Sequence, residues 1–246
     1  AVGTPLLGGE TAEHPGLMGP DEYDVAGAAT GVVEADRRLG AERVRPGDVL
    51  IALASSGLHS NGYSLVRRVV ERAGWSLERE VPEFGRALGE ELLEPTRLYA
   101  RVCLDLADAL DPAGADPADL RLRALSHVTG GGLAANLARV LPAGLIADVD
   151  RSGWLVPPVF DVVRRLGDVP WEDLEGTLNL GVGMVAVVAP EAADDAVRLA
   201  RRAGAPAWAL GTVHEAGDYA PRGRVVAGTK GVDGGSVDVF GSYRTR

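Results

Sequence analysis

Two short and almost entirely apolar segments, Val49–Ala54 (VLIALA) and Val182–Val188 (VGMVAVV), constrain the fold of this chain most strongly. Each has the length of a buried β-strand, and neither approaches the ~18 residues that a membrane span requires. Between them, Leu65, Val66 and Val69 recur at the spacing of an amphipathic helix. The combination predicts an α+β fold in which a mixed sheet is packed with helices.

Apolar patterning elsewhere predicts the remaining elements. We expect strands at residues 24–34, 145–149 and 207–213, and helices at 98–110, 133–141, 159–166 and 191–203. Residues 125–132 are expected to open the helix at 133–141. Beyond Pro221 the sequence is rich in glycine, so we expect an edge strand and a frayed tail. We place a domain boundary between Glu34 and Pro46, because the residues before it are too few to fold alone.

Charge and cysteine content exclude several kinds of partner and site. The chain has 25 Lys and Arg against 35 Asp and Glu, a net charge of -10, which argues against a nucleic-acid partner. A small phosphorylated ligand is compatible with this charge, since local backbone dipoles can bind it. Cys103 is the single cysteine, which excludes a disulfide framework and a cysteine-based zinc site. With neither a membrane span nor a signal peptide expected, we predict a cytoplasmic protein without a membrane partner.

The first candidate site follows the strand Val49–Ala54, where the sequence is SSGLHSNGYS. Its His59 is of the residue type that titrates near neutrality and can act as a general acid or base. Asn61 and the neighbouring hydroxyl groups can hold a polar ligand. The alternative is the start of a helix capped by Ser60 or Asn61, with an incidental histidine. Local chemistry favours neither interpretation.

A second candidate site is the sequence HVTGGG, which contains Thr129, Gly130, Gly131 and Gly132. Successive glycines before a helix leave backbone N–H groups open, as a phosphate-binding nest requires. The alternative is a flexible turn in which Thr129 caps the helix. Three glycines cost chain entropy and offer no side chain for packing, which favours anion binding.

Two further segments carry polar residues. Glu10 lies in a glycine- and carboxylate-rich loop, a composition that suits Mg²⁺, although its spacing alone favours a solvated acidic loop. The segment around Asn179 contains Gly-x-Gly before a strand, the wrong order for a dinucleotide fingerprint. We interpret those glycines as close packing at the start of the strand, with Asn179 at the edge of the site.

Taken in order, several strings resemble one family of enzymes. They are GGETAEHPG, EYDVAG, GDVLIALASSGLHSNGYSLVR, LLEPTRLY, HVTGGG and NLGVGM. The sequence resembles the phosphoribosylformylglycinamidine cyclo-ligases, also called aminoimidazole ribonucleotide synthetases, from about Gly8 to about Val213. Residues 57–67 are the most specific part of the match.

The resemblance implies a PurM-like C-terminal domain at residues 45–228. A remnant of an N-terminal ATP-binding and dimerisation domain would precede it at residues 1–35, and a glycine-rich tail would follow at 229–246. The implied activity is ring closure of formylglycinamidine ribonucleotide in purine biosynthesis. ATP activates the formyl oxygen by phosphoryl transfer, a neighbouring nitrogen attacks, and phosphate leaves.

Roles for single residues also follow from the resemblance. Glu10 would help to bind Mg²⁺ and ATP, and His59 would transfer a proton or bind substrate. Asn61 would donate or accept a hydrogen bond in the same cleft. Phosphate would be held by Thr129 and the three glycines Gly130, Gly131 and Gly132.

The sequence departs from the family in lacking most of the N-terminal domain. We therefore expect a fragment that is inactive alone, from a full-length protein that is a homodimer acting on a small phosphorylated substrate. Two alternatives stay open. One is a related phosphotransferase of the selenophosphate synthetase or thiamine-monophosphate kinase type. The other is a non-catalytic binding module, which predicts no phosphate binding at residues 129–132.

Overall fold

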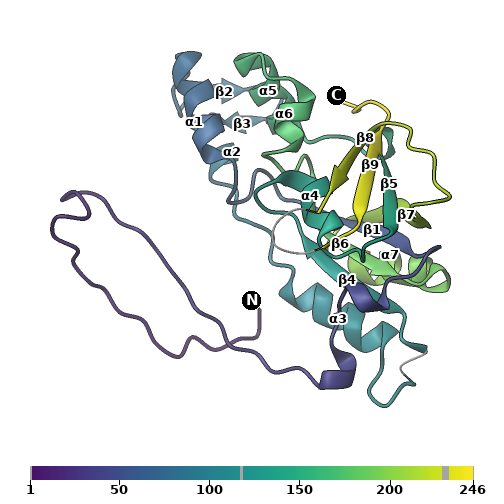
Figure 1. Cartoon of the computed structure of the whole chain (residues 1–246). Helices are drawn as coiled ribbons and strands as arrows, with labels where there is room; N and C mark the ends of the chain where they lie inside the picture. Colours follow the sequence, from purple (N-terminus) through teal and green to yellow (C-terminus); the bar gives the residue numbers. More distant parts are fainter. Residues whose placement is uncertain (1, 117–118, 229–232, 246) are drawn as a thin grey trace. The chain divides into compact units, whose positions relative to one another are not determined.

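The computed structural model describes residues 2–116, 119–228 and 233–245 (Figure 1). The chain divides into two units, Ala1–Arg38 and Leu39–Arg246. In unit 1 the described residues contain one short 3₁₀ helix, Ala35–Arg37, and are largely exposed. The strand predicted at 24–34 is not formed. This prediction is wrong. A strand needs a neighbouring strand to pair its N–H and C=O groups, and the described part of unit 1 offers none.

The described residues of unit 2 form a seven-stranded sheet with the order β4-β6-β1-β7-β5-β9-β8. The strands are β1 (Val49–Ala54), β4 (Leu122–His127), β5 (Leu145–Asp150), β6 (Val182–Val188), β7 (Ala207–Glu215), β8 (Arg224–Ala227) and β9 (Ser236–Phe240). Neighbours are antiparallel except β5 and β9, which are parallel. The sheet is therefore mixed, as predicted. A separate hairpin pairs β2 (Glu80–Val81) with β3 (Arg86–Ala87).

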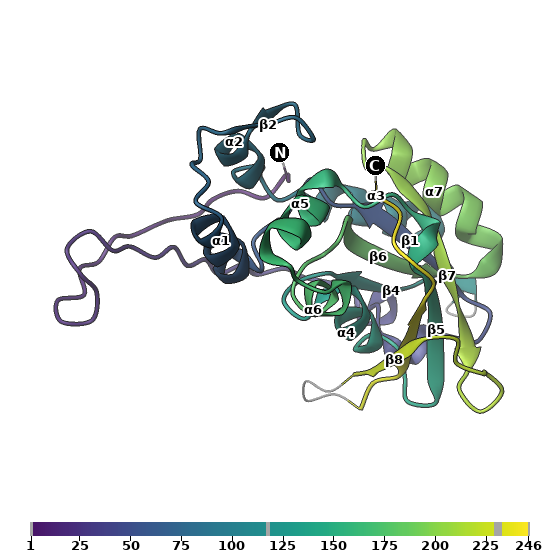
Figure 2. The same ribbon diagram turned by 90° about the horizontal axis from the view of Figure 1, so that it is seen from above.

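Helices cover both faces of the sheet (Figure 2). They are α1 (Tyr63–Arg72), α2 (Leu88–Leu92), α3 (Ala100–Leu110), α4 (Gly132–Ala138), α5 (Pro158–Gly167), α6 (Trp171–Glu175) and α7 (Ala193–Arg202). Helices α3 and α7 pack on one face, whereas α4, α5 and α6 lie on the other. None of the helices within the described ranges is both long and apolar enough to cross a membrane.

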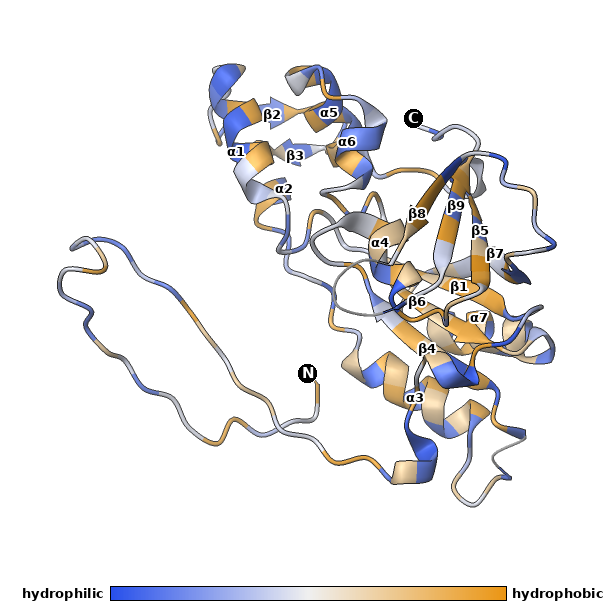
Figure 3. Cartoon of the chain, in the orientation of Figure 1, coloured by the Kyte–Doolittle hydropathy of each residue, from blue (hydrophilic) through white to orange (hydrophobic). Residues whose placement is uncertain are grey.

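The uniform apolarity of β1 follows from its burial between these two layers. Leu50 and Ala52 belong to the core cluster on the α4 side, and Ile51 and Leu53 to the cluster on the α3 side. Side chains alternate between the faces of a strand, so a strand covered on both faces needs apolar residues at every position. Hydropathy colouring shows this in β1 and β6 (Figure 3). The predicted bounds of both strands are confirmed.

The structure differs from prediction at β4 and at the C-terminal segment. Residues 125–127 were expected to open a helix, yet they complete β4, in which Leu122, Ala124 and Ser126 are buried in alternation. Within the predicted tail, residues 229–232 and 246 lie outside the described residues. Ser236–Phe240 is not frayed but forms β9, between β5 and the edge strand β8. Pairing with β5 on one side and β8 on the other holds it in place.

Candidate functional site

The two loops that the sequence offers as candidate ligand-binding sites lie next to each other in unit 2. The His59 loop (residues 55–62) follows β1, and the glycine loop (residues 129–132) follows β4. A Cβ atom built on Gly130 would lie 3.3 Å from Oδ1 of Asn61. Since β1 and β4 are both neighbours of β6 in the sheet, this convergence follows from the strand order.

Asn179 connects the His59 loop to the start of β6. Its side-chain amide donates to the carbonyl oxygens of Gly57 at 2.9 Å and Leu58 at 3.0 Å. Its Oδ1 accepts a hydrogen bond from the N–H of Gly181 at 2.9 Å. Asn179 is 4% exposed, so all these bonds are shielded from water. It is a structural connection within the site, which sequence reasoning had placed only at the edge.

His59 is buried, with 5% of its surface exposed, and its backbone has a φ of 61°. Its Nε2 accepts a hydrogen bond from the N–H of Ser56 at 3.1 Å and a longer one from the N–H of Arg97 at 3.5 Å. An imidazole nitrogen that accepts carries no proton, so the proton of the neutral ring resides on Nδ1. In the described part of the chain, Nδ1 is buried and has no hydrogen-bond partner.

The surroundings of His59 keep its ring neutral. Burial, followed by the positive charges of His127 and Arg97, lowers the pKa of His59 to about 4. This pKa lies below the value near neutrality that the residue type alone predicts. The neutral ring accepts hydrogen bonds from the backbone N–H groups of Ser56 and Arg97.

This lowered pKa predicts acid sensitivity. Above pH 6.5 the ring is neutral in both the folded and the unfolded chain, so its full contribution to stability is present. As the pH falls below 6.5, His59 becomes protonated in the unfolded chain, whereas in the folded chain it stays neutral until about pH 4. Between pH 7 and pH 5 this should remove about 2 kcal/mol of unfolding free energy.

Urea unfolding of the parent and of His59→Gln measures this loss, because glutamine keeps an acceptor near Nε2 but does not titrate. Identical pH dependence in both proteins would contradict the prediction.

Tyr99 completes this buried group and was not identified from the sequence. Its ring lies edge-on between His59 and His127, with centroid distances of 6.0 Å to each. Its hydroxyl donates to the carbonyl of Ala54 at 2.8 Å, and burial raises its pKa. A Cβ on Gly183 would lie 1.9 Å from that hydroxyl oxygen. Close packing, as predicted for the glycines at the start of β6, is thus confirmed for Gly183.

Asn136 of α4 organises the glycine loop from inside. Its Nδ2 donates to the carbonyl oxygen of Gly132 at 2.7 Å and, less closely, to those of Thr129 and Gly130. Its Oδ1 accepts the hydroxyl proton of Thr129 at 3.1 Å. Thr129 does not cap α4, whose N-cap position is occupied by Gly131. Because the carbonyls are turned to Asn136, the groups left to a ligand are the N–H groups of Gly130 and Gly131, which no described residue occupies.

Comparisons with known proteins identify the family of this chain. Residues 45–224 match the model of the AIR synthase related protein, C-terminal domain. The chain belongs to the AIR synthase related family. The resemblance seen in the sequence and the α+β fold class are thereby confirmed.

Curated relatives of this family member carry a common name. The phosphoribosylformylglycinamidine cyclo-ligase of Sorangium cellulosum (strain So ce56) is 48% identical over 228 residues, which are 92% of this chain and 63% of the relative. A putative cyclo-ligase of Streptomyces fradiae is 52% identical over 185 residues, 75% of this chain and 96% of the relative. The chain thus spans less than two thirds of the length of the Sorangium cellulosum relative. Among solved structures, thiamine-monophosphate kinase from Stenotrophomonas maltophilia K279a gives a TM-score of 0.47 at 18% identity, over 81% of this chain and 52% of that chain.

The described residues of this chain do not form a metal site. No group of three or more His, Cys, Asp or Glu side chains in the described ranges could hold a metal ion. The predicted ligand Glu10 lies in unit 1, where its side chain is exposed. A single carboxylate supplies only one of the six ligands that Mg²⁺ requires.

Proposed function

We propose that the full-length protein containing this sequence closes the imidazole ring of aminoimidazole ribonucleotide, using formylglycinamidine ribonucleotide and ATP. The observation that carries the proposal is the 48% identity, over 92% of this chain, to a relative named as that cyclo-ligase. The adjacency of Asn61 and Gly130 supports it, because it joins the two loops that a phosphorylated substrate would need.

The residues of this chain contribute binding and orientation. ATP supplies the phosphoryl group that makes the formyl oxygen a leaving group. The open N–H groups of Gly130 and Gly131 donate hydrogen bonds to a phosphate oxygen, and Asn61 hydrogen-bonds the substrate beside them. His59 fixes the His59 loop through Ser56, which keeps Asn61 in position. With Nε2 occupied by two backbone N–H groups and its pKa lowered, His59 contributes to this proposal by positioning the loop.

Further features belong to the same proposal. Glu10 contributes one ligand to Mg²⁺, and the remaining ligands come from ATP, water or other carboxylates. The full-length protein is a homodimer and acts in the cytoplasm on a small phosphorylated substrate. It binds neither nucleic acid nor a membrane, in keeping with the net charge of -10.

A substrate panel tests the proposed reaction. The full-length protein is incubated with ATP and, separately, with formylglycinamidine ribonucleotide, selenide or thiamine monophosphate. We expect ADP, phosphate and aminoimidazole ribonucleotide in equal amounts with the first substrate, and background ADP with the other two. ADP formation with selenide or thiamine monophosphate would instead establish a related phosphotransferase. Failure of all three, together with absence of ATP binding, would indicate a non-catalytic module.

A further inference from the structure

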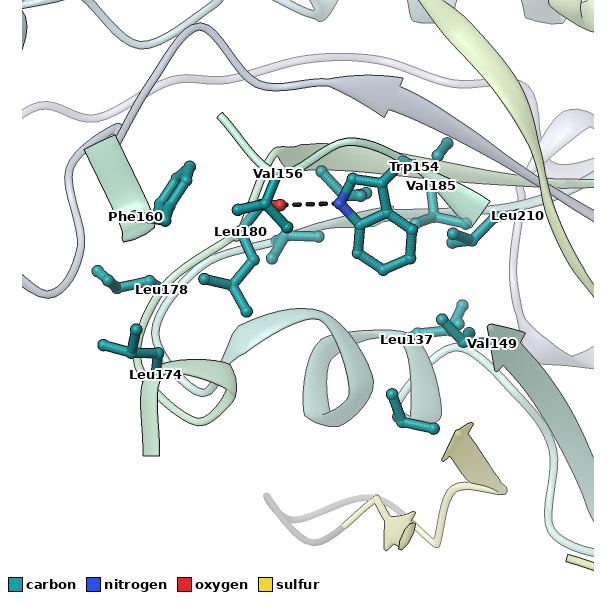
Figure 4. Packing of buried hydrophobic residues seen from close by; sticks show 14 of the residues in the cluster. Leu137, Val149, Trp154, Val156, Phe160, Leu174, Leu178, Leu180, Val185 and Leu210 are labelled. Atoms are coloured by element: carbon teal, nitrogen blue, oxygen red, sulfur yellow. Dashed lines mark hydrogen bonds between the residues drawn. The ribbon is translucent and has the colours of Figure 1, made fainter. Parts of the chain in front are cut away.

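A cavity lies in unit 2 beside the glycine loop, and Gly131 of that loop and Asn179, which binds the His59 loop, are among the residues that line it. The cavity has a volume of about 120 Å³ and lies between α4, α6 and the strands β8 and β9. Leu133 and Ala134 of α4 form one wall, and Leu178 and Leu180 form another. Figure 4 shows Leu180 beside Trp154, whose indole also lines this space.

Two aromatic rings give the cavity flat walls. Trp154 and Tyr243 both line it, with centroids 5.6 Å apart and planes inclined at 76°. Rings in such an edge-on arrangement offer both a face and an edge to a third ring. This volume of about 120 Å³ is of the same order as the ~150 Å³ apolar cavity that binds benzene, so it matches a single five- or six-membered ring.

The polar side chains of Trp154, Tyr243 and Glu175 in the wall are already paired. The indole N–H of Trp154 donates to the carbonyl of Leu180 at 2.9 Å, and the hydroxyl of Tyr243 donates to Glu175 at 2.8 Å. The carboxylate of Glu175 is also paired through both oxygens with the guanidinium of Arg151. A charged ligand would therefore be desolvated without a free partner among these three side chains, which is costly. A neutral ligand avoids this cost.

The mouth of the cavity is polar. Gly176 and Arg224 line it and are exposed, and Arg224 lies 3.8 Å from the carboxylate of Glu175. A polar substituent on a bound ring can reach these groups while the ring itself stays in the apolar interior. Small-molecule sites commonly combine an apolar lining with a few polar groups in this way. We propose that this cavity is a binding site for a neutral, single-ring aromatic or heteroaromatic group.

Chemical-shift titration of the 246-residue chain tests the proposal. Benzyl alcohol, benzoate and benzylamine are compared as probes of equal size and different charge. Saturable ring-current shifts of the Leu133, Leu178 and Leu180 methyl groups are expected with benzyl alcohol, with a Kd of about 1 mM or below. Both charged probes should bind at least tenfold more weakly. Absence of saturable shifts, or equal binding of the three probes, would overturn the proposal.

Filling the cavity provides the control. Ala134→Phe should weaken benzyl alcohol binding at least tenfold, because the new ring occupies the space. Ala134→Met is a smaller filling substitution that keeps the test valid should the phenylalanine variant fail to fold. Leu104→Met, on the exposed side of α3, should bind as the parent does. Parent-like binding by both Ala134 variants would show that the probe binds elsewhere and would overturn the assignment.

Discussion

Replacing Gly132 with alanine should lower the free energy of unfolding by about 4 kcal/mol. A Cβ at this position would lie 1.6 Å from the carbonyl oxygen of Glu175 and 2.8 Å from its carbonyl carbon. These are backbone atoms at the end of α6, so they cannot turn aside as a flexible side chain would. Gly132 also has a φ of 73°, a conformation that costs an alanine about 1–2 kcal/mol. Urea unfolding at neutral pH measures the loss.

The adjacent glycine supplies a matched control. Gly131 has a φ of 102°, but a Cβ there would meet its nearest neighbour, the Cβ of Ala135, at 3.6 Å, an ordinary contact distance. Gly131→Ala should therefore lose only the conformational part, about 1–2 kcal/mol. Equal losses in the two variants would contradict the packing explanation for Gly132.

This contrast corrects the argument that three glycines offer nothing to packing. Gly132 is required where α4 meets the last turn of α6, an explanation independent of any ligand. Gly130 and Gly131 are not crowded in that way, and no described residue occupies their N–H groups. The anion-binding hypothesis therefore rests on these two glycines. Sequence alone could not separate them, because the separation depends on a contact with residue 175.

Strands buried on both faces were the easiest part of the fold to predict. In β1 and β6 nearly every side chain is apolar, so their bounds are visible in the sequence. β4 was missed because Arg123, Ser126 and His127 interrupt its apolar residues. β9 was missed because a buried aspartate lies at its centre. Asp238 is fully buried and accepts hydrogen bonds from Tyr219, Arg222 and Gly223, partners that only the folded chain reveals.

The candidate site shows the same limit. The sequence identified His59 and Asn61 by residue type, and the strand order brings their loop beside Gly130. The neutral state of His59 could not be predicted, because it results from burial and from the charges of His127 and Arg97. Asn136 was missed because a helical asparagine carries no signal until its amide is seen on the carbonyls of the glycine loop.

Asn179→Ala should lower the free energy of unfolding by about 3 kcal/mol and release the His59 loop. The substitution leaves three buried backbone groups without their partner: the carbonyls of Gly57 and Leu58 and the N–H of Gly181. Each unpaired group costs about 1–3 kcal/mol, and a water molecule in the vacated space would recover part of this. Urea unfolding measures the loss, and amide chemical shifts report the loop.

Asn61→Ala is the matched control for this prediction. It removes the same kind of amide group, here from the His59 loop itself, but Asn61 is only half-buried, so its loss should cost about 0.5 kcal/mol or less. Asn179→Asp adds a sharper comparison, because it keeps the acceptor for Gly181 and replaces the donor with an oxygen facing two carbonyl oxygens. At pH 7 it should therefore be no more stable than Asn179→Ala. If Asn179→Ala instead lost less than 1 kcal/mol with unchanged loop shifts, the backbone alone would hold the two segments together. The role given to Asn179 would then be wrong.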